Sequence, residues 1–212
     1  MPPRTGETKA MIKTASKLWL LAMAIQISAW GTAYAAGPAV MHTGGRTTQP
    51  VGHYEFCQKL PQECNERTPK QAPVELTRKL WATIVNINNS VNTRIKPLTD
   101  IEQWGKEEVW SYPDTGFGDC EDYALEKRRE LMSAGLPAGD LLITVARRSN
   151  GDGHAVLTVR TSFGDFILDN LEPRVLVWTD TDNTYLKRQS DQNSGVWVTI
   201  NEGREDAVAS VH

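Results

Sequence analysis

Hydrophobic residues between positions 76 and 95 recur at steps of three and four, which is the period of an amphipathic α-helix. They are Leu76, Leu80, Ile84, Ile87, Val91 and Ile95. We therefore predict a helix within residues 73–95, with its apolar stripe packed against a core. Residues 101–119 contain Gly, Pro and Asp turn signals and are predicted to form a long loop.

The helical pattern resumes at Asp119 and is predicted to end near Gly135, a residue type that often follows a helix. Its apolar positions are Cys120, Ala124, Leu125, Leu131 and Met132. Cys120 therefore falls in or near the first turn, where free backbone N–H groups and the helix dipole favour a thiolate. A small buried core cysteine fits the same stripe equally well, so this position alone assigns no role.

Residues 140–173 contain three short β-rich runs, separated by the turn sequence SNGDG and by a turn near TSFGD. His154 begins the second run and Asp169 ends the third. Because the start of one antiparallel strand lies near the end of the next, we expect the imidazole and the carboxylate to be neighbours. The midpoint of the two positions lies between residues 161 and 162, whereas the Gly-Asp pair at 164–165 indicates a turn slightly later. The sequence therefore defines the pairing register of these two strands only to within a few residues.

Cys120, His154 and Asp169 together supply the groups of a nucleophilic triad. His154 would accept the thiol proton and later donate it to a leaving amine, while Asp169 would orient the imidazole. This chemistry is acyl transfer through a thioester. Each residue alone has a simpler interpretation, since a His after Gly-Asp-Gly is often a solvated loop residue and an Asp before Asn is often a turn or cap residue.

The N-terminal segment has the pattern of a secretory signal. Four Lys and Arg residues precede the apolar run LWLLAMAIQISAW and the small-residue site Ala-Tyr-Ala. We expect a signal peptide over residues 1–35, cleavage after Ala35, and a periplasmic protein with no membrane insertion after cleavage. A retained N-terminal anchor is the alternative.

Removing 35 of the 212 residues leaves 177, enough for one domain with a substantial core. The predicted organisation is a flexible N-terminus (36–52), one domain (53–201) and a polar tail (202–212). The chain has 23 Lys and Arg against 26 Asp and Glu, and the leader holds four of the former and one of the latter, so the mature net charge is −6. This balance gives no support to binding of nucleic acid or anionic membranes.

The chain contains three cysteines, and export permits disulfides. Cys57 and Cys64 lie seven positions apart around a proline, a spacing suited to a small closed loop. We favour a disulfide there over a metal pair, because no His or Cys cluster completes a zinc set. Cys120 would then be the free thiol.

Residues 175–200 have short β-like pieces that we expect to complete the sheet or its cover. The aromatic residues Trp178, Tyr185 and Trp197 are predicted to lie in the core or on a cleft wall. We expect Lys187 and Arg188 to be a solvated basic pair; the alternative is that they bind a substrate carboxylate or a partner. Trp110, in the loop ahead of the cysteine, is predicted to be a packing anchor.

Three segments carry a resemblance to a known family. GDCEDYALEKRRELMSAGLP, GHAVLTVRTSFGDFILDNL and the later YLKRQS and VWVTI resemble the bacterial transglutaminase-like cysteine proteinases, over about residues 54–200. That family includes periplasmic proteases that trim biofilm adhesins. The resemblance implies a papain-like or transglutaminase-like α+β core, in which the nucleophile helix packs on an antiparallel sheet. It also implies that Cys120 is the nucleophile, His154 the general base and Asp169 the orienting carboxylate. By the same analogy Trp110 would be a second donor to the oxyanion, as the alternative to a packing anchor.

The resemblance further implies a calcium site at the acidic residues beside the nucleophile, which here are Asp119, Glu121 and Asp122. Carboxylates beside a thiol raise its pKa by like-charge repulsion, and a bound divalent cation reverses that effect. Calcium prefers oxygen ligands of this kind. The alternative is that these residues only cap and charge the start of the helix.

We therefore expect an exported, calcium-dependent cysteine endopeptidase that acts on a periplasmic or cell-surface protein. In the adhesin-cleaving members the substrate is a surface adhesin and an inner-membrane receptor controls the enzyme, and the sequence identifies neither partner here. Two alternatives stay open. One is a protein-glutamine acyltransferase with the same triad, and the other is a non-catalytic binding module.

Overall fold

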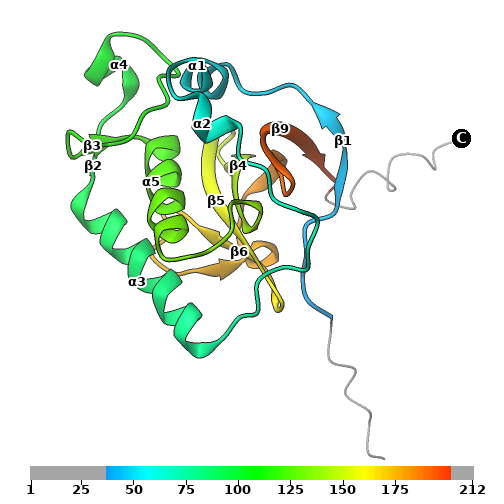
Figure 1. Cartoon of the computed structure of the whole chain (residues 1–212). Helices are drawn as coiled ribbons and strands as arrows, with labels where there is room; N and C mark the ends of the chain where they lie inside the picture. The colour runs from blue at the N-terminus through cyan, green and yellow to red at the C-terminus, as the bar shows by residue number, and fades with distance from the viewer. Residues whose placement is uncertain (1–36, 202–212) are drawn as a thin grey trace, which may run out of the picture. The chain divides into compact units, whose positions relative to one another are not determined.

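The computed structural model describes residues 37–201, so the predicted leader and polar tail lie outside the described residues. Within this part of the chain, seven strands form one antiparallel sheet in the order β1-β9-β8-β4-β5-β6-β7 (Figure 1). The strands are β1 (Thr43–Thr47), β4 (Leu141–Arg147), β5 (Gly153–Thr161), β6 (Gly164–Leu168), β7 (Leu176–Val177), β8 (Thr184–Ser190) and β9 (Asn193–Ile200). The predicted α+β class is confirmed, and so are the three strands expected within residues 140–173.

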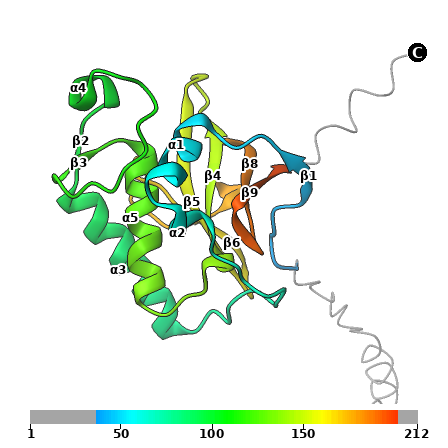
Figure 2. The same ribbon diagram turned by 45° about the horizontal axis from the view of Figure 1, so that its top comes forward.

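Helices α3 (Arg78–Arg94) and α5 (Cys120–Ser133) lie side by side on one face of this sheet, as both ribbon views show (Figures 1 and 2). The main hydrophobic core fills the space between these helices and the strands. Its fully buried members include Ile84, Leu125, Leu131, Leu141 and Leu157. Each such side chain stabilises the fold by roughly 1.5–3 kcal/mol, and together they fix α5 against β5.

Capping residues set the ends of the two helices. Helix α3 begins only at Arg78, because the Thr77 hydroxyl accepts a hydrogen bond from the backbone N–H of Leu80 at 3.1 Å. Helix α5 begins at Cys120, as predicted. Gly135 has φ of 99°, a left-handed conformation that ends the helix one turn after its last apolar residue.

The prediction that residues 101–119 form one long loop is wrong in part. This segment contains most of α4 (Asp100–Trp104) and the short strand β3 (Phe117–Gly118), which pairs in parallel with β2 (Lys96–Pro97). Thr99 starts α4 through a capping box, in which its hydroxyl and backbone N–H both bond with the N3 residue Glu102. The helix places Asp100 at its first position.

Residues 37–52, which we expected to be part of a flexible N-terminus, are instead built into the fold. Strand β1 pairs with β9, and Met41 is buried. The backbone N–H of Met41 donates to Asp165 Oδ2 at 2.9 Å, and the same oxygen accepts from Arg188 at 2.9 Å. Arg188 is therefore a buried ion-pair residue, and the prediction that it is solvated is wrong.

Helices α1 (Val51–Lys59) and α2 (Pro61–Cys64) lie together above the same face of the sheet and are joined by the Cys57–Cys64 disulfide, with Cα atoms 5.6 Å apart. The predicted pairing is confirmed, and Cys120 is the free cysteine. His53 of α1 is 1% exposed and packs edge-on against Trp110 and Trp197. This packing holds α1 against the segment that precedes α5, the helix that begins at Cys120.

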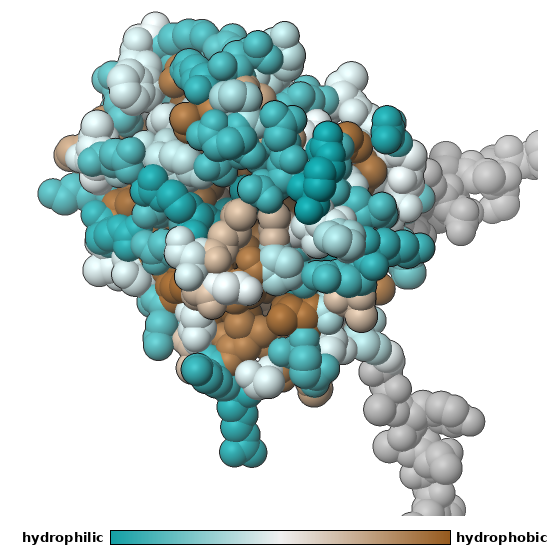
Figure 3. All heavy atoms as spheres, in the orientation of Figure 1, coloured by the Kyte–Doolittle hydropathy of each residue, from teal (hydrophilic) through white to brown (hydrophobic). Residues whose placement is uncertain are grey.

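The surface in Figure 3 is hydrophilic over most of the face shown, with one hydrophobic area in its lower half. Phe163, in the turn between β5 and β6, is the most exposed large hydrophobic residue of the described part of the chain, at 64%. Among the helices of residues 37–201, none has the length and apolar character needed to cross a bilayer.

Candidate active site

Cys120 is the first residue of α5, and Asp119 is its N-cap residue. The chain reaches this point through Gly118, where an added Cβ would lie 2.7 Å from Asp122 Cβ, so the close approach requires glycine. The first backbone N–H groups of a helix have no partner within the helix. The Cys120 N–H is therefore available to a ligand beside its own thiol.

The thiol lies in a cleft with a volume of about 470 Å³. His154, at the start of β5, lines the same cleft, so the structure brings the predicted nucleophile and base to one cavity. Besides Cys120 and His154, the lining consists of Pro50, Val51, Glu108, Trp110, Glu121, Val145, Gly153, Ala155 and Lys187. Lys187 donates to the Thr48 carbonyl at 2.8 Å, so it belongs to the cleft wall rather than to a solvated basic pair.

The predicted neighbours His154 and Asp169 form a hydrogen bond, with His154 Nε2 2.9 Å from Asp169 Oδ1. Strands β5 and β6 pair so that Leu157 faces Leu168 and Thr161 faces Gly164. The turn is therefore at residues 162–163, slightly later than the midpoint estimate, and Asp169 follows the last residue of β6. Because Nε2 is used for Asp169, Nδ1 of His154 remains for proton transfer.

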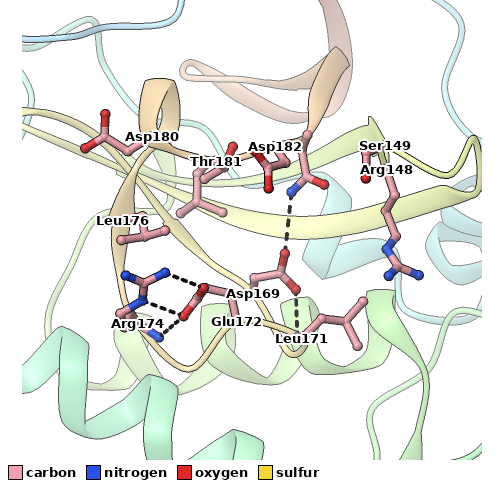
Figure 4. A pocket seen from close by; sticks show the side chains of 12 residues that line it. Arg148, Ser149, Asp169, Leu171, Glu172, Arg174, Leu176, Asp180, Thr181 and Asp182 are labelled. Atoms are coloured by element: carbon pink, nitrogen blue, oxygen red, sulfur yellow. Dashed lines mark hydrogen bonds and ion pairs between the residues drawn. The ribbon is translucent and has the colours of Figure 1, made fainter.

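Several donors hold the Asp169 carboxylate beside the imidazole, and Figure 4 shows the bond from Leu171. Oδ1 also accepts from the backbone N–H of Leu171 at 2.8 Å, and Oδ2 has a 3.5 Å contact with Asn183 Nδ2. Burial raises the pKa of Asp169, but the hydrogen bond and the charge of His154 outweigh burial, so its pKa lies below the ordinary value. The residue is therefore a carboxylate at neutral pH.

The environment of Cys120 disfavours a thiolate in the absence of a cation. Burial raises the pKa of the thiol well above its ordinary value, and the Glu121 carboxylate raises it further. The Cys120 thiol donates to Glu121 Oε2 at 3.0 Å, a bond that stabilises the neutral thiol. A nucleophile in this position needs a change in the charge of its neighbours.

Three carboxylates converge beside the thiol: oxygen atoms of Asp100, Asp119 and Glu121 all lie within 4.8 Å of one another. Two of the predicted metal residues, Asp119 and Glu121, are in this group. The third, Asp122, is not in this group; its Oδ1 accepts from the Ser111 N–H at 2.8 Å, and its Oδ2 is buried without a hydrogen-bond partner in the described structure. Asp100 was missed, although the sequence Thr99-x-x-Glu102 is a capping-box signal that predicts α4 and places Asp100 at its start.

The carboxylates of this group repel one another in a buried setting. Burial raises the pKa of Glu121 to about 9, and the Asp119 charge adds to that effect. Burial and then the Asp100 charge raise the pKa of Asp119, whose Oδ1 is buried without a hydrogen-bond partner in the described structure. Clustered carboxylate oxygens whose negative charge is not balanced by a neighbouring cation fit a hard divalent cation such as calcium.

Trp110 lies on the wall of the cleft and is 4% exposed. Its ring packs against His53 and Trp197, which agrees with a packing role. Its Nε1 atom, however, is buried without a hydrogen-bond partner among the described residues. Buried indole N–H groups are normally bonded, so this donor lacks a partner that it would ordinarily have.

A second cavity, of about 220 Å³, lies beside the Asp169 carboxylate (Figure 4). Arg174 and Glu172 face one another across one side of it and form a bidentate pair at 2.8 and 2.9 Å. Arg148, Asp180 and Asp182 also line it. The Asp169 carboxylate therefore borders this cavity.

Comparison with solved structures finds LapG of Legionella pneumophila, with 22% identity over 71% of this chain and 81% of that chain and a TM-score of 0.47. A calcium-bound LapG has 25% identity over 70% of this chain and 90% of that chain, with a TM-score of 0.44. An EGTA-treated LapG has 20% identity over 76% of this chain and 87% of that chain, with a TM-score of 0.47. No curated protein matches the chain.

The family comparison is more extensive. The sequence model described as bacterial transglutaminase-like cysteine proteinase BTLCP matches residues 43–205, which include the two cysteines of the disulfide, the thiol cleft and the whole sheet. The chain therefore belongs to the bacterial transglutaminase-like cysteine proteinases, and it is a cysteine peptidase.

Proposed function

We propose that the protein is an exported, calcium-dependent endopeptidase that cleaves a periplasmic or cell-surface protein through a Cys120-His154-Asp169 triad. The observation that carries this proposal is the shared cleft of Cys120 and His154 together with the 2.9 Å bond from His154 to Asp169. A thiol, an imidazole with a free Nδ1 and a fixed carboxylate are the groups that thioester chemistry needs.

In the proposed mechanism His154 Nδ1 accepts the Cys120 proton, and the thiolate sulfur attacks the carbonyl carbon of the scissile peptide. The Cys120 N–H and the Trp110 Nε1–H donate to the oxyanion that forms. His154 returns the proton to the leaving amine as the thioester forms. It then accepts a proton from the water that hydrolyses the thioester, while Asp169 stabilises the imidazolium in both steps.

Asp100, Asp119 and Glu121 are the residues that would hold calcium. Bound calcium would supply the positive charge that offsets these carboxylates and favours the Cys120 thiolate. Without such an offset, Glu121 raises the pKa of the thiol and accepts its proton in a hydrogen bond. The proposed calcium dependence therefore acts through the nucleophile.

The test is incubation of the purified mature protein with a mixture of exported proteins, followed by mass spectrometry of new N-termini. The proposal expects termini that appear with calcium, disappear with a chelator and are absent with Cys120→Ala. Amine incorporation or cross-links without new termini would move the assignment to acyl transfer. Identical termini from the Cys120→Ala control would refute the assigned nucleophile.

A further inference from the structure

Three side chains of the kinds that bind zinc lie together outside the thiol cleft. They are His53 and Cys57 on α1 and Cys64 at the end of α2. One ligand atom of each, an imidazole nitrogen or a sulfur, lies within 4.8 Å of the other two. The two sulfurs form the disulfide. The sequence favours a disulfide over a metal pair for want of a third ligand, and the structure supplies that ligand in His53.

The spacing of these atoms is close to that of a metal site. His53 and Cys57 are four positions apart on α1, so they share one face of the helix. Cys57 Sγ is 3.6 Å from His53 Nδ1, and Cys64 Sγ is 3.9 Å from His53 Nε2. In a tetrahedral zinc site, nitrogen and sulfur ligands are roughly 3.5 Å apart. An ion would bind one of the two nitrogens, and both sulfurs are free to turn towards it when the S–S bond is absent.

The surroundings of His53 favour a neutral imidazole, which is the form that binds metals. Gln189 Oε1 accepts from the Ile143 N–H at 2.9 Å, which orients the amide with its Nε2 3.2 Å from His53 Nε2. The indole N–H of Trp197 donates to His53 Nδ1 at 3.3 Å. Both ring nitrogens thus face N–H donors, and an imidazolium has no lone pair to accept from either.

A cavity gives an ion and a water molecule access to the cluster. Its volume is about 310 Å³, and its lining includes both cysteines and Gln49. Gln49 Nε2 lies 2.6 Å from His53 Nδ1 and 3.1 Å from Cys57 Sγ, so this amide contacts two of the three ligand residues. Three protein ligands leave one of the four zinc positions for water, which the cavity has room to hold.

The donor set selects zinc rather than calcium. Thiolate sulfur and imidazole nitrogen suit zinc, whereas calcium takes oxygen ligands. Two thiolates also balance the charge of a divalent ion, and a neutral complex costs less to bury than a charged one. The chemistry of this cluster therefore differs from that of the Asp100, Asp119 and Glu121 group.

We propose that the reduced form of the chain binds one zinc ion through His53, Cys57 and Cys64, and that formation of the disulfide displaces the ion. Binding exchanges two thiol protons for zinc. An exchange disulfide then oxidises the pair: it takes two electrons from the two thiolates and two protons from solvent and becomes two thiols, while the Cys57–Cys64 bond forms and zinc leaves. In the exported protein that we propose, zinc would hold α1 to α2 before oxidation. The site contains no catalytic group, so the inference goes beyond the proposed function.

The test is a titration of the reduced protein with cobalt(II), which occupies zinc sites and absorbs strongly when bound to thiolate. The mature chain carries Cys120→Ala, which removes the third thiol, and has no polyhistidine tag. A phosphine reduces the disulfide, and calcium is present throughout to occupy the carboxylate group. We expect a thiolate-to-cobalt charge-transfer band that saturates at one ion per chain and is lost when zinc is added. The disulfide form should give no such band.

A matched pair of histidine variants separates a ligand from a packing residue. His53→Gln should weaken cobalt binding at least about tenfold, because loss of even an outer-shell partner costs roughly 10–100-fold in metal affinity. His42→Gln, which changes an exposed histidine, is the control and should bind cobalt like the parent. The double variant Cys57→Ser, Cys64→Ser has the same open loop without thiolates and should give no charge-transfer band.

Absence of the band in reduced, folded protein would overturn the inference. So would equal affinity in His53→Gln, because the site would then be the cysteine pair alone. If the reduced chain does not fold without metal, circular dichroism follows the same titration with zinc. Recovery of the helical signal in the parent but not in His53→Gln supports the site, and no recovery in the parent overturns it. Proteolysis is not measured, so a failure here and a failure of the proposed function are separate results.

Discussion

Calcium binding should stabilise the protein much more at neutral pH than at acid pH. The perturbation is removal of calcium by a chelator, compared at pH 5.5 and pH 7.5. Burial and the neighbouring carboxylates raise the pKa of Glu121 from 4.5 to about 9. Without metal, the folded protein therefore keeps a proton on the Glu121 carboxyl group over a pH range in which the unfolded chain has lost that proton.

The sign follows from this difference in bound protons. A carboxyl group with a raised pKa in the folded state adds stability below its unfolded pKa of 4.5, and this stability is lost as pH rises towards about 9. One proton retained in the folded state makes the free energy of unfolding fall by about 1.4 kcal/mol for each unit of rising pH. Between pH 5.5 and 7.5 the protein without metal should thus lose about 3 kcal/mol, or roughly 6–12 °C in melting temperature for a domain of this size.

Bound calcium would remove this loss, because the carboxylates would then be ionised in the folded state as well. The assay is thermal unfolding followed by circular dichroism, with calcium and with a chelator, at both pH values. The melting-temperature gain from calcium should be larger at pH 7.5, and it should disappear in Glu121→Gln. Glu75→Gln, a change of an exposed carboxylate, is the control. An equal gain from calcium at both pH values, or a gain retained in Glu121→Gln, would refute the reasoning.

Three further predictions follow from the site and the disulfide. Asp169→Asn should reduce kcat by roughly 10²–10⁴-fold in a peptide-cleavage assay while circular dichroism stays unchanged, because the amide cannot stabilise the imidazolium; a loss below threefold would contradict the orienting role. Trp110→Phe keeps a ring in the packed cluster and removes the Nε1 donor, so kcat should fall by roughly 10-fold or more with little change in KM; a change in KM alone would assign Trp110 to substrate packing. Replacing Cys57 and Cys64 together by serine opens the α1–α2 loop and should cost about 2.5 kcal/mol in the free energy of unfolding by the chain-entropy relation, measured by urea denaturation; an unchanged midpoint would show that the disulfide contributes no stability.

The elements with strong periodicity were predictable from the sequence. The stripe of α3, the start of α5 at Cys120 and the three strands from β4 to β6 all follow from local patterns. The proximity of His154 and Asp169 was predicted from antiparallel pairing of their strands, and the turn lies only slightly later than the midpoint between them.

The errors have physical reasons. Strand β1 carries no strong alternation of apolar residues, and its order comes from pairing with β9 and from the Asp165–Arg188 ion pair, which are contacts with residues far along the chain. Asp100 joins Asp119 and Glu121 only because α4 and β3 fold back beside α5. Such tertiary contacts leave no periodic signal.

The most direct test of the proposed nucleophile needs no substrate. It is the rate at which iodoacetamide alkylates Cys120, followed by intact mass spectrometry at pH 7 with calcium and with a chelator. The two other cysteines form a disulfide, so the reaction reports on one thiol. The account predicts alkylation at least tenfold faster with calcium, an effect of about 1.4 kcal/mol or more on the thiolate, and slow alkylation under both conditions in His154→Ala. A rate that is unaffected by calcium and by loss of His154 would contradict the proposal that calcium and His154 activate Cys120.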